Sequence, residues 1–186
     1  LQAIKLLCKF CPYTKHHVCR IKNGERILDD ALESQNMEIT KFLFDTFDIE
    51  KMDVLGSVDL YFHDSEFMKF ILDRFDFCDQ ELNKTFSWAA QVGNLELIQL
   101  LFDHYPRVTP DCIDIVHLAS RHGHRNILYF LSDRYHQDKD QLLQMARGPR
   151  NGALRDAIDE NRLDVVQCLH TNFGLTSDDA ALGLWK

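Results

Sequence analysis

The sequence predicts an all-α protein built as a solenoid of stacked helical hairpins. Three observations predict this class: an amphipathic eleven-residue segment recurs along the chain, a shorter segment recurs just before it, and turn residues are scarce. Only 4 of the 186 residues are proline and 8 are glycine, which is few for an all-β chain and ordinary for a helical one. A lone hairpin cannot bury its apolar face, so neighbouring hairpins must stack to complete a core.

The recurring eleven-residue segments are predicted to be the second helices of the hairpins. Their third, fourth, seventh and eleventh positions are predominantly apolar and lie on one helical face. Their starts are separated by 36, 28, 30, 30 and 38 residues, which indicates a unit of about 30 residues. The six copies are LQAIKLLCKFC (1–11), MEITKFLFDTF (37–47), SEFMKFILDRF (65–75), LELIQLLFDHY (95–105), RNILYFLSDRY (125–135) and LDVVQCLHTNF (163–173).

A shorter repeated segment precedes four of these copies and is predicted to end the first helix of each hairpin. Each begins with an alanine six positions before the second helix, where a small residue allows two helices to approach closely. Gly93, Gly123 and Asn161 stand two positions before the second helix, and these residue types tolerate the left-handed conformation that ends a helix. The four segments are ALESQNME (31–38), AAQVGNLE (89–96), ASRHGHRN (119–126) and AIDENRLD (157–164).

The repeat spacing predicts one continuous array over residues 1–186. The linkers before two repeats contain helix N-terminal signals, namely Thr109-Pro110-Asp111 and Thr176 with Asp178 and Asp179. Leu1 is not an initiator methionine and no signal-like segment follows it, so we expect a piece of a longer chain. The expected divisions are a half repeat at 1–24, repeats at about 25–50, 51–78, 79–108, 109–146 and 147–175, and the start of a further repeat at 176–186.

The stretch HLASRHGH (117–124) is very similar to the core pattern of ankyrin repeats, His-Leu-Ala-Ala-x-x-Gly-His. The segments at 89–105 and 153–180 resemble ankyrin repeats as well, in the style of the divergent arrays of amoebae, large DNA viruses and intracellular bacteria. The Thr-Pro-Leu-His opening of the family is missing, and the linkers DIEKMDVLG and GLTSDDA lack the usual β-hairpin residues. The resemblance therefore implies a solenoid whose β-hairpin fingers are short or absent.

The resemblance implies a non-catalytic protein–protein interaction module. In ankyrin arrays, two residues at the end of each first helix face a concave groove that binds a partner protein. Exposed aromatic residues beside arginine are typical of binding hot spots. The poorly matching unit at 55–75 contributes Tyr61 and Phe62 as a hot spot, with their burial in an irregular repeat as the alternative. The predicted partner-binding residues are Glu33, Ser34, Tyr61, Phe62, Gln91, Val92, Arg121, His122, Asp159 and Glu160.

The three histidines of HLASRHGH raise the question of a metal site. In the ankyrin pattern His117 hydrogen-bonds the backbone between repeats and His124 follows the turn glycine, whereas His122 is a solvated groove residue. The equivalent positions in other repeats carry Ser87 or Asn94, so no complete ligand set recurs. We therefore expect a structural role for His117 and His124, and no metal.

A second possible metal site lies in the first repeat. Cys8 and Cys11, followed by His16, His17 and Cys19, offer enough ligands for zinc. Cys11, however, occupies the eleventh position of the repeat, which carries phenylalanine or tyrosine in the other copies, and this favours a core role. Without a signal sequence, the six cysteines favour reduced thiols and a cytoplasmic location, including a host cytosol if the source is a virus or an intracellular bacterium.

The remaining patterns exclude several classes of function. No phosphate-binding loop, nucleophile elbow or His-Glu-x-x-His motif is present, so neither catalysis nor a cofactor is expected. The net charge of −8 and the lack of a basic stripe disfavour nucleic acid, and no apolar run is long enough for a membrane span. An architectural spacer remains an alternative. The apolar residues of AALGLWK (180–186) additionally allow self-association through an uncovered repeat.

Overall fold

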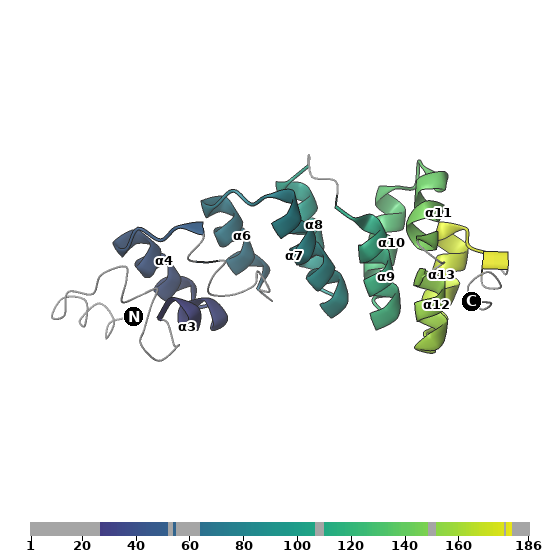
Figure 1. Ribbon diagram of the computed structural model, residues 1–186, viewed down its shortest axis with the longest axis horizontal. Coiled ribbons are helices and arrows are strands. Elements are labelled where there is room, and N and C mark those ends of the chain that lie inside the picture. Colours follow the sequence, from purple (N-terminus) through teal and green to yellow (C-terminus); the bar gives the residue numbers. More distant parts are fainter. Residues whose placement is uncertain are drawn as a thin grey trace. The chain divides into compact units, whose positions relative to one another are not determined.

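The computed structural model describes residues 27–51, 54, 64–106, 110–148, 152–176 and 178–179 (Figure 1). Within these ranges the chain forms α-helices joined by short turns, and none of these residues is in a β-strand. The predicted all-α class is confirmed. The chain divides into two compact units, Leu1–Phe77 and Cys78–Lys186, and the single continuous array stays a prediction.

The first unit contains one helical hairpin and one further helix. Helix α3 (Ile27–Glu33) packs against α4 (Met37–Thr46), and α6 (Ser65–Arg74) follows them in sequence. The turn residue Gln35 has a positive φ of 50°. Its side-chain oxygen accepts a hydrogen bond of 2.7 Å from the backbone N–H of Asp64, the N-cap of α6. The hairpin turn is thereby attached to the start of α6.

An aromatic cluster forms the core of the first unit. The ring of Phe44, which is buried, stacks on Phe70 with centroids 5.7 Å apart and meets the edge of Phe75 at 5.5 Å. Such pairs contribute about 0.5–1.5 kcal/mol beyond the burial of their area. These rings join α4 to α6 and to the residue that follows it.

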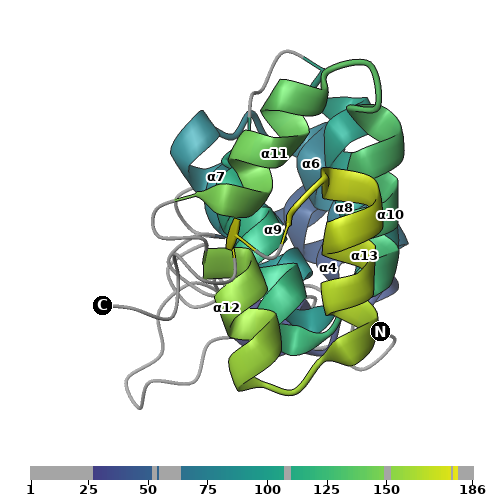
Figure 2. The ribbon, with the colours of Figure 1, turned by 90° about the vertical axis from the view of Figure 1, so that its right-hand side faces the viewer.

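The second unit contains three stacked hairpins. The first helices contact one another in the order α7, α9, α12, and the second helices contact one another in the order α8, α10, α13. Figure 2 shows the two rows side by side, with α7, α9 and α12 in one and α8, α10 and α13 in the other. The hairpins are α7 (Asp79–Val92) with α8 (Leu95–His104), α9 (Cys112–His122) with α10 (Arg125–Arg134), and α12 (Gly152–Asp159) with α13 (Leu163–Phe173).

The helix boundaries follow the repeated sequence signals. The second helices α4, α6, α8, α10 and α13 begin at the first residue of their eleven-residue segments, whereas the copy at 1–11 lies outside the described residues. The turns take the predicted left-handed conformation, with φ of 80° at Gly93, 84° at Gly123 and 55° at Asn161. Asn94 then caps α8, because its side-chain oxygen accepts a 3.0 Å hydrogen bond from the N–H of Leu97.

An additional helix, α11 (Lys139–Arg147), lies between the second and third of these hairpins in sequence and is not predicted by the repeat pattern. It accounts for the long spacing of 38 residues between the last two second helices. Helix α11 packs against α9, α12 and α13 and buries Leu142, Met145 and Ala146. Its nine residues are too few to show a sustained helical period.

A buried carboxylate joins α11 to the segment that follows α13. Asp179, which is 1% exposed, accepts a 2.8 Å bond from Nε of Arg147 and bonds from the N–H and hydroxyl of Thr176 at 2.9 and 3.1 Å. Burial acts to raise the pKa of Asp179, but these hydrogen bonds outweigh it and lower the pKa below its usual value. The N–H of Thr176 donates to the carboxylate of Asp179, three residues later, and this bond is half of a capping box.

Candidate binding surface

Six of the predicted partner-binding residues lie together on the second unit. Each first helix ends at the same end of the stack, and its last residues precede the left-handed turn residue. Because α7, α9 and α12 are stacked directly on one another, these ends form three successive levels of one surface. All six residues are exposed. We call this set the turn surface: Gln91 and Val92, Arg121 and His122, Asp159 and Glu160.

Contacts between hairpins hold the levels in register. The Nε2 atom of His124 lies 2.9 Å from the backbone oxygen of Gln91 in the preceding hairpin, and since a carbonyl only accepts, this nitrogen donates. The imidazole of His124 covers Gly93 so closely that a Cβ there would overlap the ring. The guanidinium of Arg162 lies against Gly123 one hairpin later, but less closely, since a Cβ there would come to 3.2 Å from Nε of Arg162. His124 and Arg162, which follow the turn residues of the second and third hairpins, thus each pack against the turn of the preceding hairpin.

The rings of His122 and His124 stack at the middle level. Their centroids are 6.3 Å apart and their planes are inclined by only 16°. His124 is itself held by Gln91, so the stack restrains the exposed ring of His122. The side chain of His122 is thus presented on the surface in a defined position.

The other predicted residues do not belong to this surface. Glu33 and Ser34 are exposed at the end of α3 in the first unit, where the hydroxyl of Ser34 donates to the backbone oxygen of Ala31 at 3.3 Å. Tyr61 and Phe62 lie outside the described residues.

His117 has a packing role that differs from the one expected. Its ring fits against Gly148 and Gly152, so that a Cβ on either glycine would overlap it. Its Nε2 atom is buried without a hydrogen-bond partner among the described residues, and the expected bond to the backbone between hairpins is made by His124 instead. Nor do His, Cys, Asp and Glu side chains in the described part of the chain gather in threes or more around a possible metal position.

The environment of His117 predicts a pH dependence of stability. Burial lowers the pKa of His117, and the carboxylates of Asp156, Asp114 and Asp111 oppose this shift only in part. The pKa in the unfolded chain is about 6.5, so between the two values the unfolded chain binds more protons. The free energy of unfolding is therefore expected to fall as the pH decreases below about 6.5.

The pH prediction is tested by comparing the parent chain with a His117→Gln variant in denaturant titrations at several pH values. Glutamine removes the titrating ring, so the variant is expected to lose less stability than the parent between neutral and mildly acidic pH. Equal losses in the two proteins would contradict the assignment to His117.

The buried thiols are poor candidates for nucleophiles. Burial raises the pKa of both Cys112 and Cys168. The sulfur of Cys112 lies 3.5 Å from the hydroxyl of Tyr135, and burial together with this contact raises the pKa of Tyr135 to about 12. Since the thiolate is the reactive form, both thiols are protonated and unreactive near neutral pH. The cysteines and histidines of the possible zinc site at residues 8–19 lie outside the described residues.

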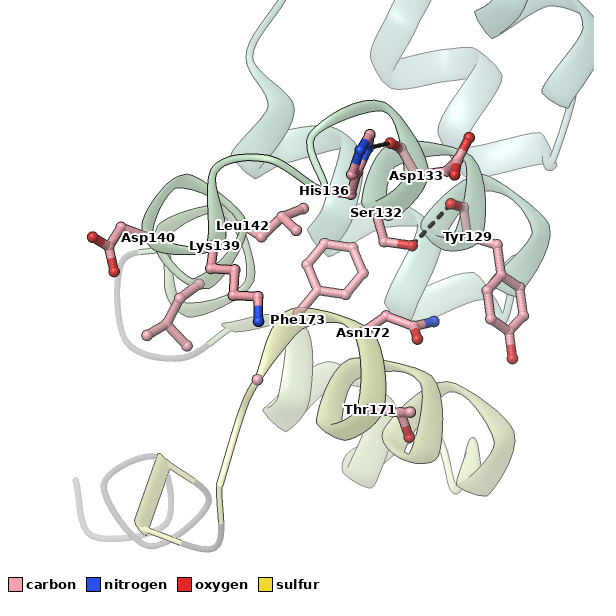
Figure 3. A pocket seen from close by; sticks show the side chains of 12 residues that line it. Tyr129, Ser132, Asp133, His136, Lys139, Asp140, Leu142, Thr171, Asn172 and Phe173 are labelled. Carbon is pink, nitrogen blue, oxygen red and sulfur yellow. Dashed lines mark hydrogen bonds between the residues drawn. The ribbon is translucent and has the colours of Figure 1, made fainter.

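A pocket of about 670 Å³ opens between α10, α11 and α13 (Figure 3). Figure 3 shows the ring of Phe173, which is buried, in the middle of the lining side chains, with the ammonium group of Lys139 nearby. Two polar groups of its wall bind backbone oxygens near the end of α10. The hydroxyl of Ser132 donates to the backbone oxygen of Tyr129 at 2.9 Å, and Nδ1 of His136 lies 2.5 Å from the backbone oxygen of Asp133. Its charged residues are one lysine and two aspartates, a mixture that favours no class of ligand.

Comparisons of the chain with models of known protein families, with curated proteins and with solved structures find no match. None of the helices in the described ranges combines the length and the apolar character needed to cross a membrane.

Proposed function

We propose that the chain is a divergent ankyrin-type solenoid that binds a partner protein through the turn surface without catalysing a reaction. The observation that supports this proposal is the alignment of three exposed residue pairs at one end of three stacked helices. The same helices bury their other faces, with Ala89, Ala119 and Ala157 fully buried. The buried residues of these helices thus stack the hairpins, and the turn surface stays exposed for recognition.

The chemistry of the two buried thiols argues against either of them as a catalytic nucleophile. Cys112 and Cys168 are buried free cysteines whose raised pKa values make them inert. Buried free thiols also suit the reducing cytosol in which we place the protein.

A partner protein is expected to depend on all three levels of the turn surface. The test uses the full chain as bait in a lysate, with bound proteins identified by mass spectrometry and then measured as purified proteins. A variant with Gln91→Ala, Arg121→Glu and Asp159→Lys is expected to weaken binding by about tenfold or more, because charge reversal replaces attraction by repulsion.

The control variant carries the same three kinds of substitution on exposed positions of the second helices: Gln99→Ala, Arg125→Glu and Asp103→Lys. This control variant is expected to bind the partner with the same affinity as the parent chain. A partner that binds the parent and both variants equally would show that the turn surface is not the binding site. The absence of any partner would favour the architectural spacer.

A further inference from the structure

The chemical character of the turn surface changes in a definite order along the stack. The α7 level presents Val92, which is 40% exposed, beside the neutral Gln91. The α9 level presents Arg121 and His122, and the α12 level presents Asp159 and Glu160. The surface therefore runs from apolar through basic to acidic over three hairpins.

A third nitrogen-rich side chain strengthens the basic level. The guanidinium of Arg162 lies against Gly123, the residue next to His122. Arg121 has no ion-pair partner among the described residues. Arginine side chains bind carboxylates with paired hydrogen bonds, so the middle level is suited to an acidic side chain.

The acidic level is also available to a ligand. Asp159 pairs with Arg155 at 3.5 Å within α12, but both side chains are more than half exposed, and such pairs contribute little in water. The carboxylate of Glu160 makes no ion pair within the described part of the chain. This level is suited to lysine or arginine.

We propose that the turn surface binds an extended segment of a partner protein that carries an apolar, an acidic and a basic residue in that order, about three residues apart. This proposal rests on the proposed function and specifies its partner. Packed helices lie about 8–10 Å apart. A segment in the polyproline II conformation rises about 3.1 Å per residue and has three residues per turn, so one level corresponds to about three residues and every third side chain faces the surface. The apolar residue lies on Val92, the acidic one on Arg121 and the basic one on Glu160.

The probe is a phage-displayed library of random twelve-residue peptides, selected on the full chain. Enriched peptides are expected to contain the apolar, acidic and basic residues at three-residue intervals, in either chain direction, always with the acidic residue in the middle. Enriched peptides without this order would overturn the proposal, and so would a failure to enrich any family of peptides.

A charge-reversed chain, with Arg121→Glu and Glu160→Lys, provides the matched selection. Both positions are exposed, so the fold is expected to persist, which circular dichroism verifies. This chain is expected to enrich peptides with the basic residue in the middle and the acidic residue at the end. The best peptide of the parent is expected to bind the Arg121→Glu chain about five- to tenfold more weakly, and a lysine in place of its acidic residue is expected to restore binding. Selection of the same peptides by both chains would refute the charge order.

The two proposals fail in different ways. If the lysate partner depends on the turn surface but the library shows no charge order, the binding function stands and the inferred partner chemistry is wrong. If the control variant and the turn-surface variant behave alike in the lysate and the library is not enriched, both proposals fall.

Discussion

Phe86→Ala is expected to lower the free energy of unfolding of the second unit by about 3–5 kcal/mol. The side chain of Phe86 is 1% exposed, and its ring meets the edge of Phe102 with centroids 5.0 Å apart. Burial of a phenylalanine contributes about 1.5–3 kcal/mol, and the aromatic pair adds about 0.5–1.5 kcal/mol. The rest of the loss comes from the cavity that alanine would leave where the ring joins α7 to α8.

Denaturant unfolding of the full chain, followed by tryptophan fluorescence, measures this loss. Trp88 lies in α7, so its emission reports on the second unit. Lys84→Ala is the control on the same helix, since this residue is exposed, and it is expected to change stability by less than about 0.5 kcal/mol. A loss below about 1 kcal/mol for Phe86→Ala would show that the pairing of α7 with α8 is not built around this ring.

Gly93→Ala is expected to destabilise the second unit by about 2–3 kcal/mol. With φ at 80°, an alanine at this position pays about 1–2 kcal/mol for the left-handed conformation. Its Cβ would also overlap the imidazole of His124. The ring must then move away from the backbone oxygen of Gln91. This movement breaks a hydrogen bond that contributes about 1 kcal/mol to stability.

Gly174→Ala separates these two costs. Gly174 has a similar φ of 75° at the end of α13, but a Cβ there would meet no atom within 4 Å. Only the conformational cost applies at Gly174. The decrease in the free energy of unfolding is therefore expected to be smaller than that of Gly93→Ala by about 1 kcal/mol. Chemical denaturation of Gly93→Ala, His124→Ala and the double variant completes the test, because His124→Ala should remove the extra cost. Strictly additive losses would mean that the ring of His124 does not hold the two turns together.

The second helices could be predicted from the sequence because they are defined by a local property. The eleven-residue segments place apolar residues on one helical face wherever the helix lies in the chain. For this reason the five starts within the described ranges agree with the prediction, at Met37, Ser65, Leu95, Arg125 and Leu163. The turns at Gly93, Gly123 and Asn161 were predictable for the same reason, since glycine and asparagine accept a positive φ without help from distant residues. The positive φ of Gln35 was not predictable in this way, because glutamine is not one of these residue types.

The residues of the turn surface could be predicted only in part. Their positions relative to the turn follow from the repeat, so the exposure of Gln91, Arg121 and Asp159 was expected. The position of the His122 ring was not expected, because it depends on the stack with His124 and on the backbone of another hairpin. No residue type signals a hydrogen bond to a backbone oxygen 33 residues away.

The sequence by itself determined the all-α class, the helical hairpins and their turns, because each of these follows from residues that are neighbours in the chain. The tertiary structure alone decided which histidine joins the hairpins, where α11 packs and how Arg147 reaches the buried carboxylate of Asp179. It also placed the apolar, basic and acidic levels on one surface. Such partnerships form between residues that lie far apart in sequence, and they exist only once the helices have stacked at a particular distance and register.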